Sequence, residues 1–319
     1  MNKISDRLER LAESATLAMA RKSREFISRG IDVISLSLGE PDFDTPDFIK
    51  EAAKKAIDDN FSHYTPVSGL VDLRQSIAQK FKRDNNLDFT TDQIVVSTGA
   101  KQSLANVCLS LLNKDDEVLL PCPYWVSYAE IIKIAEALPV KIESDISNDF
   151  KVTVEQLENA ITSKTRMLMF SSPCNPSGTV YSQSELEDIS KMLEKYPNIF
   201  VVSDEIYEHI NFTSSHFSIG SIEAMKDRTI TVNGVSKGFA MTGWRVGFIG
   251  APKWIANACT KIQGQITSAT CAVAQKATER AMLADPKSAT SEMKEKFLIR
   301  RDYLIKLLSE IPGFICNVP

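Results

Sequence analysis

The feature of this sequence that most limits its fold is a regular alternation of short apolar runs with longer amphipathic stretches. Seven runs are too short for helices and are expected to be strands: 93–97, 117–120, 140–142, 167–170, 199–203, 229–232 and 246–249. Strands that alternate with helices typically form a mostly parallel sheet with helices on both faces. The pattern therefore predicts an α/β fold around a mostly parallel central sheet.

The two ends of the chain depart from this alternation. Residues Arg7–Arg29 are expected to form one helix, followed by a short strand at Val33–Leu36 and a turn-rich loop. Pro46 is well placed to begin the next helix. Near the other end we expect a long charged helix over Pro286–Ser309, followed by an apolar, strand-like segment at Phe314–Cys316.

Composition and charge exclude several classes of protein. The 319 residues include 37 basic and 41 acidic ones, a net charge of −4, which argues against nucleic acid as the main partner. No apolar run is long enough to cross a membrane, and Met1–Ser14 lacks the apolar core of a secretory signal. The six cysteines form no C-x-x-C pair and the three histidines match no metal motif. We therefore expect reduced thiols, a cytoplasmic location and no metal site.

Chemically useful residues follow four of the predicted strands. They are Thr98–Lys101 at a helix start, Asn175 in a turn, Asp204 and Tyr207 after a buried run, and Lys237 after the next. Each of them alone has an ordinary explanation, such as a helix cap, a turn or a surface charge. Because ligands of open α/β sheets bind beyond the carboxyl ends of the strands, we expect these groups to meet in one crevice.

Two familiar motifs can be set aside. Gly234–Gly238 spells the G-x-S-x-G of a hydrolase nucleophile turn, but that fold places its histidine after the serine, and all three histidines precede Ser236. The G-x-G-x-x-G and Walker A patterns are absent, so nucleotide binding is disfavoured.

A lysine, a carboxylate, a phenol, an amide and a phosphate cradle together suit pyridoxal phosphate. Its aldehyde condenses with a lysine, and its ring nitrogen needs an acidic partner. Asp204, at the end of a buried strand, can supply that acid. The helix that begins near Gly99 can hold the phosphate on its backbone N–H groups, and Arg245 can bind it with two hydrogen bonds.

Three motifs resemble the class I aminotransferases of pyridoxal phosphate fold type I. They are Pro173-x-Asn175-Pro176-x-Gly178, Asp204-Glu205-Ile206-Tyr207, and Ser236-Lys237 followed by Gly243-x-Arg245-x-Gly247. Within that family the chain is most similar to the bacterial aspartate aminotransferase subgroup, some members of which also use prephenate. The segments that carry this finer similarity are 14–16, 39–43, 99–102 and 123–128.

The resemblance implies that Lys237 is the catalytic residue. It forms the Schiff base with the cofactor, and its freed amine then moves a proton between the substrate Cα and the cofactor carbon. A desolvated lysine with a lowered pKa suits this task. Around the cofactor ring the resemblance implies Asp204 on the pyridine nitrogen, Tyr207 and Asn175 on the ring oxygen, and Trp125 stacked on the ring.

The resemblance also implies a phosphate site and a shared active site. Gly99, Ala100 and Arg245 bind the phosphate. Tyr64 matches a tyrosine that reaches the phosphate of the neighbouring subunit, which implies a homodimer.

The implied substrates are an amino acid and a 2-oxo acid. Trp125, Asn175 and the backbone of Gly39 contact the substrate, and Lys101 and Thr16 bind a distal carboxylate. These residues imply a ping-pong transaminase that exchanges the amino group between L-aspartate and 2-oxoglutarate. The alternatives are a prephenate or aromatic amino acid aminotransferase, an aminotransferase-like effector module of a transcription regulator, and a chain that binds the cofactor without full activity.

The sequence departs from the family pattern at two places. Gly234, three residues before Lys237, replaces a phosphate-binding serine. Members of the family continue for several tens of residues past Pro319 and carry there the arginine that binds the substrate α-carboxylate, which Arg280, Arg300 and Arg301 do not match. We expect residues 45–284 to form a large cofactor-binding domain, residues 1–44 an N-terminal arm and part of a small domain, and residues 285–319 the start of the rest of that domain.

Overall fold

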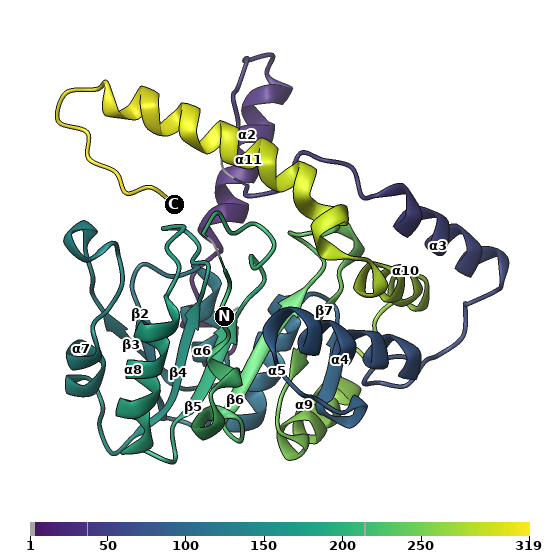
Figure 1. Cartoon of the computed structure of the whole chain (residues 1–319), viewed down its shortest axis with the longest axis horizontal. Coiled ribbons are helices and arrows are strands. Elements are labelled where there is room, and N and C mark those ends of the chain that lie inside the picture. Colours follow the sequence, from purple (N-terminus) through teal and green to yellow (C-terminus); the bar gives the residue numbers. More distant parts are fainter. Residues whose placement is uncertain (1–3, 37, 214) are drawn as a thin grey trace.

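A seven-stranded sheet forms the centre of the computed structural model, which describes residues 4–36, 38–213 and 215–319 (Figure 1). The strand order is β1-β7-β6-β5-β4-β2-β3, and β7 runs antiparallel to both of its neighbours while the other pairs are parallel. The strands are β1 (Ile94–Ser97), β2 (Glu117–Pro121), β3 (Leu138–Ile142), β4 (Thr165–Ser171), β5 (Phe200–Asp204), β6 (Thr229–Gly234) and β7 (Gly247–Gly250). All seven predicted strands, and the mostly parallel sheet, are therefore confirmed.

Helices cover both faces of the sheet. They are α1 (Asp6–Glu9), α2 (Ala15–Ser28), α3 (Asp47–Asp58), α4 (Val71–Asn85), α5 (Ala100–Leu111), α6 (Ser127–Ile134), α7 (Val154–Asn159), α8 (Gln183–Glu194), α9 (Lys253–Ile266), α10 (Ala272–Leu283) and α11 (Pro286–Ser309). Pro46 stands directly before α3, and α11 has the predicted bounds.

Successive side chains of a strand point to opposite faces of the sheet, so one strand can contribute to the cores on both faces. Val118 and Leu120 of β2 pack in a core with α5, α6 and α9, whereas Leu119 between them packs with α7 and α8. A third core joins β1 and β7 to α3, α4 and α10. Since every central strand is covered on both sides, its sequence is an uninterrupted apolar run.

The predictions for the two ends need correction. The single helix over Arg7–Arg29 is wrong, because α1 ends at Glu9 and α2 begins at Ala15. Between them the backbone N–H of Ala12 donates to Glu130 of α6 at 2.9 Å, so it makes no helical hydrogen bond. The strand over Val33–Leu36 is also wrong: these described residues have no strand conformation, and Leu36 is 91% exposed.

The expected strand-like segment at Phe314–Cys316 likewise forms no strand within the described ranges. Apolar composition alone predicted it, but a strand also needs a ladder partner for its backbone groups.

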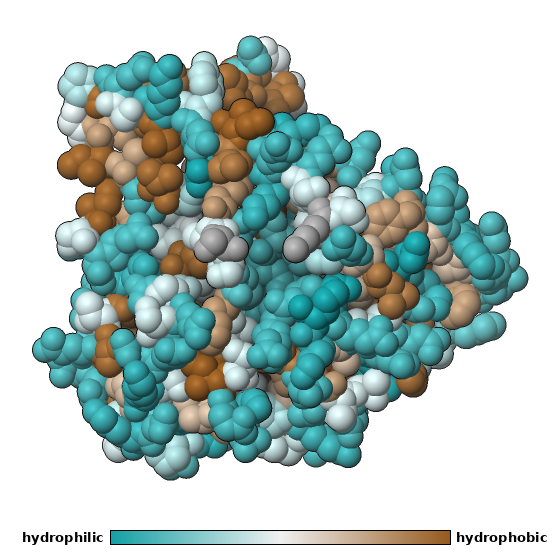
Figure 2. Space-filling model, in the orientation of Figure 1, coloured by the Kyte–Doolittle hydropathy of each residue, from teal (hydrophilic) through white to brown (hydrophobic). Residues whose placement is uncertain are grey.

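α2 and α11 lie above the edge of the sheet in Figure 1 and carry exposed apolar side chains. Figure 2 shows such side chains gathered on the upper part of this face, whereas the lower part is mostly hydrophilic. Among the described helices, none is both long and apolar enough to cross a membrane.

Candidate active site

The register of the sheet brings the predicted site residues to one edge. Asp204, the last residue of β5, lies level with Ser171 of β4 and Val232 of β6. Asn175 and Lys237 therefore follow their strands at the same edge as Asp204. Because β7 is antiparallel, its first residue, Gly247, lies at this edge too, next to the end of β1. The register thus places the four strand exits at the same end of the sheet.

Asp204 is a buried carboxylate, 4% exposed. Burial raises its pKa to about 6, partly offset by hydrogen bonds. The hydroxyl of Tyr128 donates to Oδ2 at 2.7 Å, and the backbone N–H of Ile206 donates to Oδ1 at 3.2 Å. The sequence reasoning did not assign Tyr128 to the site, although it lies in the 123–128 segment; a tyrosine on a buried helix face needs a partner for its hydroxyl.

Asn175 and Tyr207 form a second pair at this edge. The Nδ2 of Asn175 donates to the Tyr207 hydroxyl at 3.1 Å. Burial raises the pKa of Tyr207 to about 12, so the phenol stays protonated. Both residues line a cavity of about 430 Å³, together with Gly39.

Lys237 lies beside this pair. Its Nζ is 5.8 Å from the centre of the Tyr207 ring and donates a hydrogen bond to the carbonyl oxygen of Gly39. Burial lowers the pKa of Lys237, and Arg245 adds to this, while Glu40 opposes it. A lowered pKa makes more of the neutral, nucleophilic amine available near neutral pH.

Arg245 packs closely against the start of α5, and glycines make this approach possible. Gly99 has φ +86°, and a Cβ on it would lie 2.5 Å from Nη2 of Arg245. A Cβ on Gly247 would lie 2.2 Å from the backbone nitrogen of Ala100. The glycines thus let a guanidinium and the first N–H groups of a helix approach one another, which suits a phosphate.

Position 234 is also closely packed. A Cβ on Gly234 would lie 2.9 Å from the carbonyl oxygen of Val246. The backbones of β6 and β7 therefore leave no room for the serine of the family pattern without a shift.

Trp125 and Lys101 lie together near Asp204. The Nζ of Lys101 is 4.9 Å from the centre of the Trp125 ring, and Trp125 contacts Tyr128 edge to face, with ring centres 5.5 Å apart. Burial, and then the charge of Arg245, lower the pKa of Lys101. Trp125 therefore contacts the tyrosine that donates to Asp204, and Lys101 contacts Trp125.

Two predicted residues are not joined to this group by the hydrogen bonds of the described chain. The Thr16 hydroxyl pairs with that of Ser14 at 3.0 Å, at the start of α2. Tyr64 is fully exposed. Two of the arginines that do not match the family's carboxylate-binding motif have partners in this structure. Arg300 pairs with Asp42 at 2.6 Å. Arg301 lines the cavity and donates to the carbonyl oxygen of Pro319 at 2.8 Å.

These residues fit pyridoxal phosphate. A buried carboxylate suits the ring nitrogen, a lysine with a lowered pKa suits the aldehyde, and the glycine-lined cradle suits the phosphate. The described residues also offer three groups that could ligate a metal, Glu205, Glu208 and His216.

Comparisons with known proteins agree with this arrangement. The family model "Aminotransferase class I and II" matches residues 31–319. The aspartate/prephenate aminotransferase of Cereibacter sphaeroides is 43% identical over 99% of this chain and 79% of its own length. The crystal structure of the aspartate aminotransferase from Rhizobium meliloti superposes with a TM-score of 0.96 at 38% identity, over 100% of this chain and 80% of that one. An aromatic aminotransferase from Pyrococcus horikoshii superposes with a TM-score of 0.87 at 39% identity, over 96% of this chain and 77% of that one.

Proposed function

The chain belongs to the class I and II aminotransferases, in the aspartate/prephenate subgroup, and from that premise we propose that it exchanges the amino group between L-aspartate and 2-oxoglutarate. The family uses pyridoxal phosphate. The observation that carries the proposal is the meeting of Lys237, Asp204 and the Asn175–Tyr207 pair at one edge of the sheet.

Each site residue has a place in this proposal. Bound pyridoxal phosphate supplies an aldehyde that condenses with amines and a ring that withdraws electrons from the substrate Cα. Asp204 holds the ring nitrogen, with Tyr128 holding the carboxylate in turn. The residues proposed to hold the rest of the cofactor are Tyr207 and Asn175 for the ring oxygen, Trp125 for the ring face, and Gly99, Ala100 and Arg245 for the phosphate.

Lys237 moves the proton. With the cofactor bound, its Nζ would take a proton from the substrate Cα and deliver it to the cofactor carbon, which needs the amine to be neutral for part of each cycle. Desolvation of the side chain favours the neutral amine. Because the two half-reactions share one site, the first product leaves before the second substrate enters.

The proposed substrates are dicarboxylic acids. We assign the distal carboxylate to Lys101, which stands at the first turn of α5, and to Thr16, and we assign contact with the substrate to the backbone of Gly39. Prephenate is the second candidate, because relatives of this chain are named aspartate/prephenate aminotransferases. An aromatic amino acid is the third, from the likeness to an aromatic aminotransferase.

The assembly and division of the chain are proposals as well. All seven strands lie within residues 45–284, which we propose as the cofactor-binding domain. α2 and α11, from residues 1–44 and 285–319, are proposed as parts of the small domain. We propose a homodimer with shared active sites, since Tyr64 is free to reach a second copy. All six cysteines are free, which supports a cytoplasmic location.

The test is a titration of the protein with pyridoxal phosphate. The wild-type chain should retain a visible absorbance band after desalting, Lys237→Ala should lack it, and Lys133→Ala, a surface lysine paired with Glu130, should keep it. L-Aspartate should then bleach the band, and a panel of amino acids would rank the donors. A band that survives Lys237→Ala would contradict the assignment.

A further inference from the structure

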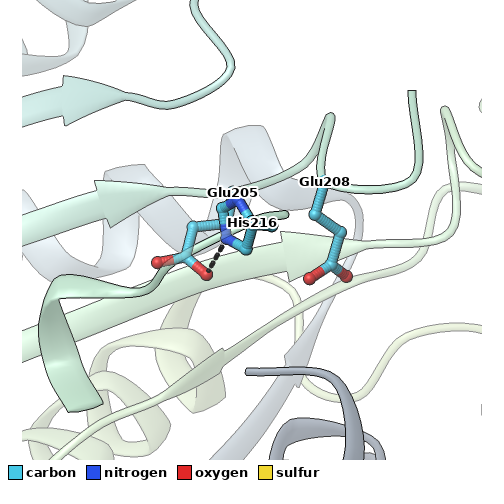
Figure 3. Close-up of side chains that lie close together, drawn as sticks. All are labelled: Glu205, Glu208 and His216. Atoms are coloured by element: carbon cyan, nitrogen blue, oxygen red, sulfur yellow. Dashed lines mark hydrogen bonds and ion pairs between the residues drawn. The ribbon is translucent and has the colours of Figure 1, made fainter. Parts of the chain in front are cut away.

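Five polar side chains from α4 and from the segment after β5 form a hydrogen-bonded network. We call Lys80, Asn85, Glu205, Glu208 and His216 the buried network. Lys80 and Glu205 are each 1% exposed. Figure 3 shows His216 paired with Glu205 and Glu208 close by. One polar side-chain atom of each of the three residues lies within 4.8 Å of the others. Such a cluster needs positive charge, because buried carboxylates are costly unless they are paired.

The chain supplies this positive charge itself. The ammonium of Lys80 is paired with Glu208 and donates to Oδ1 of Asn85 at 2.5 Å. The amide of Asn85 donates to Glu205 at 3.0 Å and to Glu208 at 2.7 Å. Lysine and amide donors thus pair with the carboxylate oxygens of this cluster.

Glu208 is ionised in this network. Burial alone would raise its pKa, but Lys80, with help from the two neighbouring histidines, holds it well below its ordinary value. Its side chain is 4% exposed. An ionised carboxylate at this depth is a strong and fixed hydrogen-bond acceptor.

Glu208 also joins the two strand exits that carry the proposed catalytic groups. Its own position is four residues after Asp204, in the turn that follows β5. Its Oε1 accepts a hydrogen bond at 2.8 Å from Nδ2 of Asn233 in β6. The Oδ1 of Asn233 accepts from the backbone N–H of Gly234 at 2.7 Å, so both ends of this amide are held four residues before Lys237.

The next residue adds a packing contact to the same loop. His209 lies edge to face with Phe239, with ring centres 5.7 Å apart. A Cβ on Gly238 would lie 2.7 Å from the His209 ring. The segment after β5 therefore contacts the segment after β6 on both sides of Lys237 in sequence.

From these contacts we propose that Glu208 is a positioning residue, which fixes Lys237 relative to Asp204 through Asn233. Lys80 is the counter-ion that allows a carboxylate to stand there. The inference rests on the proposed function, since it assigns Lys237 and Asp204 to one cofactor. Displacing a reacting group by about 1 Å can cost about 100-fold in rate. Loss of the hydrogen bond between Glu208 and Asn233 should therefore have a measurable effect.

Two double variants with the same net charge distinguish the positioning effect of the Glu208 oxygen from the effect of burying its charge. Lys80→Met/Glu208→Gln removes both charges but keeps an oxygen for Asn233, whereas Lys80→Met/Glu208→Leu removes that oxygen too. The readouts are the dissociation constant for pyridoxal phosphate, the pH midpoint of the visible absorbance change, and the unfolding temperature without cofactor. Glu185→Gln on α8, which loses an ion pair with Lys151, is the control for lost stability alone.

The Gln variant should bind pyridoxal phosphate within about threefold of wild type. The Leu variant should bind about tenfold more weakly and shift the absorbance midpoint, whatever its unfolding temperature. Asn233→Ala removes the same hydrogen bond from the β6 side and should give the same dissociation constant and absorbance midpoint as the Leu variant. It replaces the Leu variant in the comparison if that variant does not fold. Equal dissociation constants and midpoints in the Gln variant and Asn233→Ala would overturn the inference alone. A wild-type chain without a visible band would overturn the proposed function and this inference with it.

Discussion

Replacing Tyr128 with phenylalanine tests the electrostatics of the site without any cofactor. The change keeps the ring and its contact with Trp125 but removes the hydroxyl that donates to Asp204 at 2.7 Å. A hydrogen bond to a buried charged group contributes about 1.5–3 kcal/mol. The carboxylate loses that stabilisation and its protonated form does not, so the pKa of Asp204 rises further above about 6.

The sign of the effect on stability follows from linkage. The pKa of Asp204 is about 6 in the folded chain, against an ordinary value of 3.8, so the folded protein holds this proton more tightly than the unfolded one. Folding is therefore penalised by about 3 kcal/mol above pH 6, and the penalty disappears as the pH falls toward 3.8. Tyr128→Phe increases the penalty by about 2 kcal/mol at pH 8 and adds little near pH 4.

The assay is urea unfolding of the cofactor-free protein at several pH values between about 4 and 8. The free energy of unfolding of Tyr128→Phe should approach that of the wild type as the pH falls. Tyr181→Phe is the matched control: its hydroxyl is also buried but accepts from the backbone N–H of Val152 at 3.3 Å. That variant should lose a similar free energy at every pH. If the Tyr128→Phe and wild-type curves run parallel, the hydroxyl does not stabilise the carboxylate and the reasoning is wrong.

Two further substitutions probe the proposed binding groups. Gly99→Ala places a Cβ 2.5 Å from Arg245 in a backbone conformation that L-residues rarely adopt, and should weaken pyridoxal phosphate binding about tenfold in an absorbance titration. Gly243→Ala, in the Arg245 loop with open space around it, should bind as wild type does, and equal affinities would refute the cradle. Lys101→Ala should lower kcat/KM for aspartate about 10- to 100-fold more than for alanine, because one charge-assisted hydrogen bond is lost; an equal loss on both would remove Lys101 from substrate recognition.

The sequence predicted the sheet well because burial on both faces leaves a local signal. Each central strand is an apolar run between polar stretches, and all seven runs became strands. Val33–Leu36 is also mostly apolar but forms no strand, and Ile34 and Leu36 are 87% and 91% exposed. Whether an apolar run becomes a strand thus depends on a partner elsewhere in the chain, which local composition does not encode.

The sequence predicted those site residues that directly follow the ends of parallel strands. The rule that ligands bind beyond the strand ends selected Lys237, Asp204 and Asn175, and the register brings their strand exits together. Tyr128 was missed because its contact with Asp204 joins residues 76 positions apart. The buried network was missed for the same reason, since Lys80 and Glu208 belong to α4 and to the turn after β5 and look like surface charges in the sequence.

Burial acts in opposite directions on the two proposed catalytic groups. It raises the pKa of Asp204 to about 6 and lowers that of Lys237, so it favours the neutral form of each. For Lys237 this is useful, because the neutral amine accepts the proton. For Asp204 it is a cost, since the ring nitrogen needs the carboxylate, and Tyr128 offsets only part of it. A cationic ring nitrogen bound against Asp204 would remove most of the remaining cost, about 3 kcal/mol. Without cofactor, the buried Asp204 carboxylate therefore lowers the stability of the folded chain. Binding of a protonated pyridine ring would relieve this cost, whereas a neutral ring would not, so the site favours the protonated ring.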